Sequence, residues 1–269
     1  MLCELGFEID FARATKNGAV EPDEIARLLR PDTLLVSVMS ANNETGAIQP
    51  IAEIARICRD RALLFHCDAT QSAGKTALDV DLGMERGADL LTLSAHKIGG
   101  PKGVGALYIR RGTRMKPLLR GGAQERGRRA GTENVPAIAG FGAAASHATT
   151  FQAAHAAHLQ SLRNQLESGL LKLGNVEIIA GNAPRAPHIS SFIFCGTRAE
   201  SLALNLDLQG FAVGTGSACA SGALEPSHVL AAMGYDAKAA KSALRVSFGA
   251  HNTGEEVGEF LEVVEKLRS

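Results

Sequence analysis

Aromatic residues are scarce in this sequence. It has no tryptophan, 2 tyrosines and an aromatic content of 4%, whereas glycine occurs 29 times. Because glycine permits tight turns and close backbone contacts, we expect functional surfaces built from turns rather than from aromatic platforms. Apolar runs are short, and none approaches the ~20 residues that a membrane-spanning helix needs. Residues 1–8 include acids where a secretory signal would be basic, so the sequence predicts a cytoplasmic protein.

A net charge is missing as well. Lys and Arg total 28, Asp and Glu total 28, and the formal net charge at pH 7 is 0. No overall field draws such a chain to nucleic acid or to an anionic membrane, and we expect neither as a partner. The arginines of the stretch 120–131 therefore favour a subunit interface or a loop near a phosphate over a nucleic-acid patch.

Cysteines are few, and no two of them form a CxxC pair. The 5 cysteines leave at least one unpaired, which favours reduced thiols over a disulfide framework. They are Cys3, Cys58, Cys67, Cys195 and Cys219. Cys58 and Cys67 fall within helix and strand patterns, and Cys195 ends an apolar strand, so we expect these three to be structural.

The composition of the 269 residues, 45% hydrophobic and 21% charged, is typical of a globular protein. It excludes a disordered chain, collagen and a small disulfide scaffold. In the first half, predicted helices alternate with apolar strands. The helices cover 22–30 and 49–61, and the strands cover 33–39, 63–67, 88–93 and 104–109. This alternation indicates an α/β domain over residues 1–150, with a mostly parallel sheet flanked by helices.

The second half has a different pattern. A long helix is predicted over 134–173, with a leucine stripe that ends at Gly174. A coiled coil would also show such a stripe, but packing within the chain is preferred because the stripe is short. Strands at 176–180, 190–194 and 244–248, with helices at 200–209 and 255–267, predict a smaller α+β domain over 151–269.

Polar residues follow several of the apolar runs. Ligands of open α/β sheets bind outside the carboxyl ends of the strands. The segments at such positions are NNE (42–44), DATQ (68–71), SAHK (94–97) and a small-residue loop (214–221). Each alone has an ordinary explanation, and a lysine such as Lys97 is most often a surface residue. Together they indicate one ligand.

The chemistry of these side chains suggests which ligand that is. A lysine held at the end of a sheet loses part of its hydration and can form a Schiff base with an aldehyde. An aspartate in the same pocket can keep a pyridine nitrogen protonated, which makes the ring of pyridoxal 5′-phosphate an electron sink. Lys97 and Asp68 are the candidates for these roles. Ser94 and His96 flank Lys97, where they can bind the phosphate or the phenolic oxygen.

The motifs around these residues resemble a known family. They are NNETG (42–46), DATQ (68–71), SAHKIGGPKGVGALY (94–108), QERG (124–127), RAGTENVP (129–136), GSACASG (216–222) and LEPSHVL (224–230). In this order, they are similar to the pyridoxal phosphate-dependent cysteine desulfurases of the NifS and IscS type, in the class V aminotransferase family. The resemblance covers nearly the whole chain and implies the PLP-dependent transferase fold of type I.

The resemblance implies a set of cofactor-binding residues. Lys97 would carry the Schiff base, and Asp68 would pair with the pyridine nitrogen. Gln71 would contact the phenolic oxygen, and Ser94 and His96 the phosphate. His96 would also be catalytic, because an imidazole with a pKa near 6.5 can relay protons beside the ring.

Further residues complete the implied site. Asn43 would contact the cofactor and the carboxylate side of the substrate. Thr132, from the second subunit of a homodimer, would complete the phosphate site; a helix is predicted to begin near it, and free N–H groups there favour an anion. Strand alternation separates Arg245 from the apolar Leu244 and Val246, and its planar guanidinium would grip the substrate carboxylate.

Cys219 is the candidate nucleophile. Its loop, 214–223, has three glycines and almost no bulky side chain, so we expect an exposed thiol. The resemblance implies conversion of L-cysteine to L-alanine with a persulfide left on Cys219. The sulfur would pass to an acceptor such as an iron–sulfur scaffold protein, for general cluster assembly or for nitrogen fixation. Through its persulfide, Cys219 would also be the only candidate metal ligand, a transient one for iron–sulfur clusters.

The sequence departs from the family at its beginning and in one turn. Family members carry an upstream segment that supplies part of the large-domain sheet and a histidine that stacks on the cofactor, so the chain is expected to be N-terminally incomplete. Gly99 and Gly100 replace a bulkier pair. Two alternatives stay open beside a cysteine desulfurase. One is a selenocysteine lyase or another enzyme of the same cofactor fold, and the other is an inactive fragment that only binds a partner.

Overall fold

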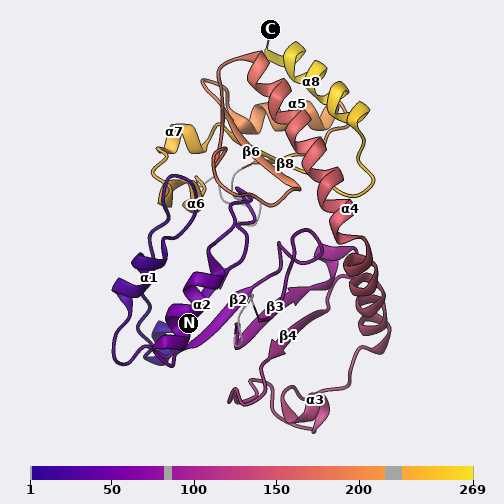
Figure 1. Ribbon diagram of the computed structural model, residues 1–269. Coiled ribbons are helices and arrows are strands. Elements are labelled where there is room, and N and C mark those ends of the chain that lie inside the picture. The colour runs from indigo at the N-terminus through magenta and orange to yellow at the C-terminus, as the bar shows by residue number, and fades with distance from the viewer. Residues whose placement is uncertain (1, 82–86, 216–225, 269) are drawn as a thin grey trace. The chain divides into compact units, whose positions relative to one another are not determined.

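The structure is a computed structural model that describes residues 2–81, 87–215 and 226–268 (Figure 1). It divides into two compact units. Unit 1 contains Met1–Pro31, Ala41–Pro50 and Ala153–Ser269, and unit 2 contains Asp32–Ser40 and Ile51–Gln152. This differs from a division into 1–150 and 151–269, because two early segments cluster with the C-terminal residues. One reason is Ala47, which is fully buried in a cluster with Ile179, Leu230 and Met233, a long-range contact that local sequence patterns do not reveal.

Unit 2 contains a four-stranded sheet in the order β1-β2-β3-β4. The strands are β1 (Leu35–Met39), β2 (Leu64–Asp68), β3 (Leu90–Ser94) and β4 (Gly105–Ile109). β1, β2 and β3 run parallel, whereas β4 is antiparallel to β3. The prediction of a mostly parallel sheet is therefore confirmed, with an antiparallel strand at one edge.

Helix α2 (Ile51–Asp60) packs on β2 by an apolar face, as its pattern predicts. Ile54, Ala55 and Cys58 form that face and are 0–1% exposed. Unit 2 also contains the 3₁₀ turn η2 (Ala95–Ile98), the short helix α3 (Gln124–Gly127) and the first part of α4 (Val135–Leu173).

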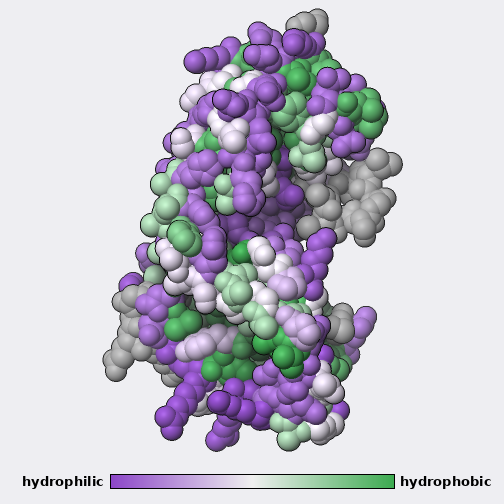
Figure 2. All heavy atoms as spheres, turned by 90° about the vertical axis from the view of Figure 1, so that its right-hand side faces the viewer, coloured by the Kyte–Doolittle hydropathy of each residue, from purple (hydrophilic) through white to green (hydrophobic). Residues whose placement is uncertain are grey.

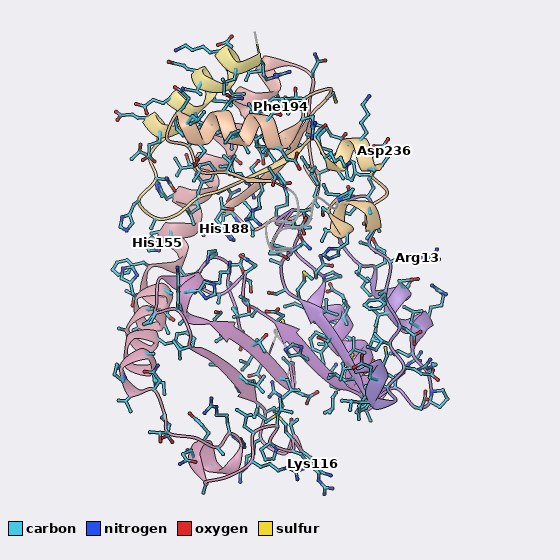
Figure 3. All side chains as sticks on the ribbon, turned by 180° about the vertical axis from the view of Figure 1, so that it is seen from behind. Arg13, Lys116, His155, His188, Phe194 and Asp236 are labelled. Carbon is cyan, nitrogen blue, oxygen red and sulfur yellow. The ribbon has the colours of Figure 1, made fainter. Side chains whose placement is uncertain are left out.

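Unit 1 contains a second sheet, which is antiparallel throughout and has the order β5-β6-β8-β7. Its strands are β5 (Val176–Ile178), β6 (Ile189–Phe194), β7 (Gly214–Thr215) and β8 (Ala243–Ser247). All six residues of β6 are buried, as expected of an inner strand that is covered on both faces. Phe194, labelled in Figure 3, packs edge-on against Phe192 at 5.4 Å, and the Arg268 guanidinium lies 4.2 Å from its ring centroid.

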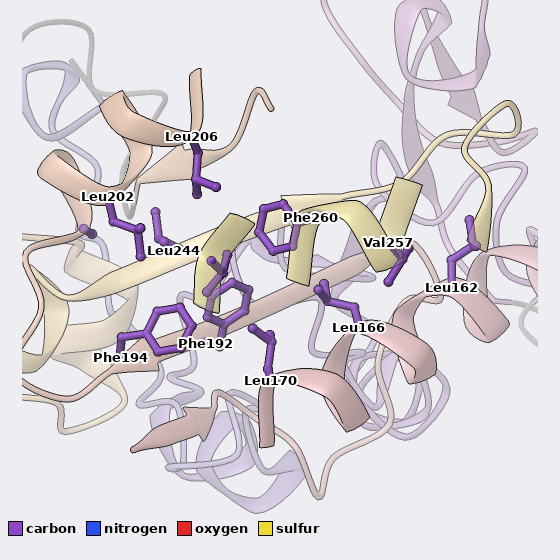
Figure 4. Packing of buried hydrophobic residues seen from close by; sticks show 12 residues of the cluster. Leu162, Leu166, Leu170, Phe192, Phe194, Leu202, Leu206, Leu244, Val257 and Phe260 are labelled. Carbon is purple, nitrogen blue, oxygen red and sulfur yellow. The ribbon is translucent and has the colours of Figure 1, made fainter. Parts of the chain in front are cut away.

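Helices α5 (Ala199–Leu208) and α8 (Gly254–Arg268) and the second part of α4 supply the core of unit 1 (Figure 4). From α4 come Leu162, Leu166 and Leu170, which are 0–4% exposed. The leucine stripe therefore packs within the chain, as predicted. Unit 1 also has η1 (Cys3–Leu5), α1 (Pro22–Leu28), α6 (His228–Ala232) and α7 (Ala237–Ala240).

Candidate active site

The candidate residues of unit 2 gather at the carboxyl ends of β2 and β3. Asp68 is the last residue of β2, and it pairs in register with Thr92 of β3. β3 ends at Ser94, and the chain continues directly into η2, which carries His96 and Lys97. Because the two strands are parallel and adjacent, the sheet brings the aspartate and the lysine to the same edge, as the sequence predicts.

Hydrogen bonds fix the backbone and one oxygen of Asp68. Its Oδ1 accepts from the Thr70 N–H at 2.9 Å, and its carbonyl accepts from the Ser40 N–H at 2.7 Å and from Ser40 Oγ at 3.0 Å. Ser40 Oγ also lies 2.6 Å from Ser72 Oγ. Asp68 Oδ2 has no hydrogen-bond partner among the described residues. The carboxylate therefore has one oxygen held by the protein and one available for a cationic N–H group.

Ser94 and His96 contact each other, with 2.8 Å between Ser94 Oγ and His96 Nδ1. This contact orients the exposed imidazole, whose Nε2 points away from the serine. Lys97 is half-buried, and Gly99, which ends η2, has φ +86°, a conformation that favours glycine. A Cβ at Gly100 would lie 3.0 Å from the Ala95 carbonyl oxygen and 3.2 Å from Ala144, so the small pair lets this turn approach α4 closely.

Sequence reasoning missed Lys75. Its Nζ donates a hydrogen bond to the backbone carbonyl of Lys97, and burial, followed by the charge of Lys97, lowers the pKa of Lys75 to about 8. Gly74, with φ +69°, brings the segment close to Ile98 and to Ala148 of α4. One signal in the sequence could have marked it. Lys75 directly follows the small residues Ser72, Ala73 and Gly74, and a lysine is seldom found in a turn that is partly buried.

The candidate residues of unit 1 form a second group. Arg245 Nη1 donates to the carbonyl of Asn43 at 3.0 Å, which links two residues 202 positions apart. Leu244 is in the core, with Val246 and Phe248 packed against it, so the predicted strand alternation is confirmed. Among the described residues, Arg245 Nε is buried without a hydrogen-bond partner. A spare guanidinium N–H is suited to binding a carboxylate.

Two predictions need correction. Thr132 does not begin helix α4, because α4 starts at Val135 and the Asn134 Oδ1 accepts from the Ala137 N–H at 3.3 Å in the capping role. The role of Thr132 therefore depends on the family resemblance alone. Cys195, which was predicted to be structural, is exposed, whereas Cys58 and Cys67 are buried, in agreement with a structural role. Burial raises the pKa of Cys58 to about 11 and that of Cys67 to about 12, which suits inert thiols.

Cys219, the predicted nucleophile, lies outside the described residues, since the segment 216–225 is not among them. Its roles as nucleophile and as transient metal ligand stay predictions. Across the described ranges, no three His, Cys, Asp or Glu side chains form a group that could hold a metal ion. Within the same ranges, no helix is long and apolar enough to cross a membrane.

Comparison with known proteins agrees with this arrangement. The model of the family "Aminotransferase class-V" matches residues 1–260. The chain belongs to the class-V aminotransferase family. It is 43% identical over 265 residues to "Cysteine desulfurase IscS" of Dictyoglomus turgidum, covering 98% of this chain and 66% of the relative. It is 45% identical to "Cysteine desulfurase IscS" of Methanosarcina thermophila, covering 97% of this chain and 64% of that one.

Among solved structures, a "NIFS-LIKE PROTEIN" matches with a TM-score of 0.90 and 38% identity, over 99% of this chain and 70% of the other. The likeness confirms the α/β class and the type I fold. The chain spans about two thirds of the length of the curated relatives, 66% and 64% for the two named above.

The class-V family depends on pyridoxal 5′-phosphate. The described residues fit that cofactor. Lys97 could supply an amine for its aldehyde, one carboxylate oxygen of Asp68 is open to a pyridine nitrogen, and the Ser94–His96 pair offers hydrogen-bonding groups at the same edge of the sheet.

Proposed function

We propose that this protein acts as a cysteine desulfurase, which removes sulfur from L-cysteine and passes it on through Cys219. The observation that carries the proposal is the placement of Lys97 and Asp68 at the ends of neighbouring parallel strands. It occurs in a chain whose curated relatives are named cysteine desulfurase. The alternative of an aminotransferase is less well supported, because it has no use for a thiol in the 214–223 loop.

In this proposal, the residues of unit 2 hold the cofactor. When bound, pyridoxal 5′-phosphate supplies an electron sink for the bonds to the substrate α-carbon. Asp68 Oδ2 would keep the pyridine nitrogen protonated, and Gln71 would contact the phenolic oxygen. Ser94 and His96 would bind the phosphate, and Lys97 Nζ would hold the aldehyde carbon. As a free amine, Lys97 Nζ would be one candidate to accept the substrate α-proton, and His96 would be the other.

The residues of unit 1 would bind the substrate and take its sulfur. Arg245 would hold the carboxylate of L-cysteine, with Asn43 beside it. The thiolate of Cys219 would attack the substrate sulfur, so that an S–S bond forms while the carbon–sulfur bond breaks. The carbon keeps that electron pair and takes up a proton. L-cysteine and the Cys219 thiol thus give L-alanine and a Cys219 persulfide.

The proposal extends to partners. A homodimer would let Thr132 of one subunit reach the phosphate site of the other. Its support is the family resemblance, together with Val135, which lies three positions after Thr132 and is 66% exposed. Figure 2 shows the face that carries α4, where hydrophobic residues lie at the surface among hydrophilic ones. The acceptor would be an iron–sulfur scaffold protein, and the cytoplasmic location stays a prediction.

A single substitution tests this function. In the presence of a thiol reductant, which frees sulfide from a persulfide, Cys219→Ser should keep the visible absorbance of bound cofactor and abolish sulfide release from L-cysteine, because the cofactor groups are intact and the sulfur-accepting thiol is gone. Cys195→Ser is the matched control, since Cys195 is exposed and has no proposed role. Sulfide release by Cys219→Ser at the wild-type rate would contradict the proposal. Absence of cofactor absorbance in the folded wild-type chain would favour a partner-binding role instead, and selenide release without sulfide release would favour a selenocysteine lyase.

A further inference from the structure

The turn at residues 68–76 of unit 2 is fixed by a series of backbone hydrogen bonds. The Ala69 N–H donates to the Thr92 carbonyl of β3 at 3.1 Å. The Ser72 N–H donates to the Ala69 carbonyl at 3.2 Å, and the Lys75 N–H donates to the Ser72 carbonyl at 3.0 Å. Ala69 is 0% exposed and Ser72 is 3% exposed. These buried bonds hold the chain between the end of β2 and Lys75 in one conformation.

The end of this turn contacts η2 in two ways. The side chain of Lys75 makes a polar contact, because its Nζ donates to the backbone carbonyl of Lys97. The preceding Gly74 makes an apolar contact, since a Cβ there would lie 3.3 Å from Ile98 Cγ2. The turn therefore starts at Asp68, one candidate cofactor group, and seven positions later it holds the backbone of Lys97, the other one.

The pairing of the strands does not extend to Lys97. β3 ends at Ser94, so Lys97 lies three positions beyond the last residue of that strand. At the end of η2, the Gly100 N–H donates to the Ala95 carbonyl at 2.9 Å, a bond that is local to this turn. The contact from Lys75 is different, because it links η2 to the end of the neighbouring strand β2.

Stability alone does not explain a lysine at position 75. Burial lowers the pKa of Lys75 to about 8, and the charge of Lys97 is the second cause. The folded chain therefore disfavours the ammonium form of this side chain, which at neutral pH is a cost that an uncharged side chain of the same length would not have. A donor directed at the Lys97 carbonyl offers a functional reason for that cost.

We propose that Lys75 is a positioning residue for Lys97, which it holds through the backbone of η2. The inference rests on the proposed function, because that function makes Lys97 the residue that binds the cofactor aldehyde. Lys75 touches neither cofactor nor substrate in this proposal. It ties the turn that begins at Asp68 to the turn that carries Lys97, so that the group for the pyridine nitrogen and the group for the aldehyde keep a constant spacing.

Hydrogen exchange at about pH 7 tests the anchoring in the full chain without cofactor. Lys75→Met keeps the length of the side chain and removes the donor, so the amides of 95–100 should exchange about tenfold faster. The amides of 54–58 in α2, in the core of the same unit, should stay unchanged. Lys116→Met, at an exposed lysine of unit 2, is the matched control and should change neither region. Wild-type exchange at 95–100 in Lys75→Met, or faster exchange in both regions, would overturn the proposal.

Coupling to the cofactor tests the consequence. The chain is mixed with pyridoxal 5′-phosphate, samples are reduced with borohydride at set times, and the cofactor fixed to each lysine is measured by mass spectrometry. Lys75→Met should couple at Lys97 about tenfold more slowly than the wild type, because the amine is less often in the required position. Lys75→Arg, which keeps an N–H donor, should restore most of the rate.

Two results of the coupling experiment would overturn the positioning role. One is a wild-type rate in Lys75→Met, and the other is cofactor fixed to Lys75 in place of Lys97 in the wild type. If the wild type fixes no cofactor at all, the proposed function fails, whereas the exchange experiment still decides whether Lys75 anchors η2.

Discussion

Units 1 and 2 each contain a four-stranded sheet, but the apolar side chains of the two sheets are covered to different extents. Unit 1 buries phenylalanines and leucines from its sheet and three helices, among them Phe192, Phe194 and Leu206, all at 0% exposure. In unit 2, the sheet leaves Leu35 at 43%, Met39 at 41% and Leu107 at 42% exposed. The two sheets are alike in strand number and unlike in how much of their apolar surface the described chain covers.

Small-residue contacts surround the site of unit 2, beside a core that includes Phe65 at 1% and Leu91 at 1% exposed. Gly74 approaches Ala148 and Ile98, and Gly140 of α4 lies against Pro101 so closely that a Cβ would sit 2.7 Å from that ring. These contacts let the turns that carry Asp68, Lys75 and Lys97 lie close to one another. The comparison teaches that the sheet of unit 1 is covered by large side chains on its strands and helices, whereas the sheet of unit 2 combines a buried core with exposed apolar strand residues and close small-residue turns at its site.

The largest expected effect comes from the core of unit 1. Phe192→Ala should lower the free energy of unfolding by about 3–5 kcal/mol, because it leaves a cavity at a fully buried site. Leu208→Ala is the control, since Leu208 is 73% exposed on α5 and its loss should cost less than about 0.5 kcal/mol. Urea denaturation measures both. Equal effects of the two substitutions would contradict the account of the unit 1 core.

A pH-dependent effect should come from Lys75 in unit 2. Its pKa is lowered from 10.5 to about 8 in the folded chain, so the unfolded state binds more protons between those pH values. The contribution of Lys75 to the free energy of unfolding should therefore rise with pH across that window, by up to about 3 kcal/mol. Lys75→Met should remove the rise.

The measurement is the difference in unfolding free energy between wild type and Lys75→Met at about pH 7 and about pH 10. Taking the difference cancels the titration of Cys58 and Cys67, which both proteins contain. Lys102→Met, at an exposed lysine of the same unit, is the control and should leave the pH dependence unchanged. A constant difference between wild type and Lys75→Met would show that Lys75 is not held in a desolvated site.

The smallest effect is expected at the edge strand of unit 2. Leu35→Thr should change the unfolding free energy of this chain by no more than about 0.5 kcal/mol, because Leu35 is 43% exposed. Val36→Thr, at a neighbouring residue that is 8% exposed, should cost about 1–3 kcal/mol by burying a hydroxyl. Similar costs at both positions would mean that β1 is covered on both faces, which would break the contrast between the units.

Much of the secondary structure could be predicted from periodicity. β1, β2 and β6 lie within one or two residues of their predicted bounds, and α4 begins at Val135 where a start at 134 was predicted. β7, which has two residues, and α6 and α7, which have five and four, are too short for a pattern. The assignment of residues 1–31 and 41–50 to unit 1 depends on long-range contacts such as those of Ala47, which no local signal encodes.

Part of the candidate site could be predicted, because some of its residues are marked by local sequence patterns and others only by long-range contacts. Asp68 and Lys97 stand at strand ends, where position alone marks them. Lys75 contacts the backbone of Lys97, 22 positions away, and only the folded chain shows this contact.

The central claim is that Cys219 takes sulfur from L-cysteine. The direct measurement is mass spectrometry of the full chain, loaded with pyridoxal 5′-phosphate, mixed with L-cysteine and then alkylated. We expect the peptide that contains Cys219 to gain one sulfur atom beneath the alkyl group, with an equal amount of L-alanine released. The added sulfur should be absent from the Cys195 peptide. L-alanine release without added sulfur on Cys219, or no reaction in the cofactor-loaded protein, would contradict the account.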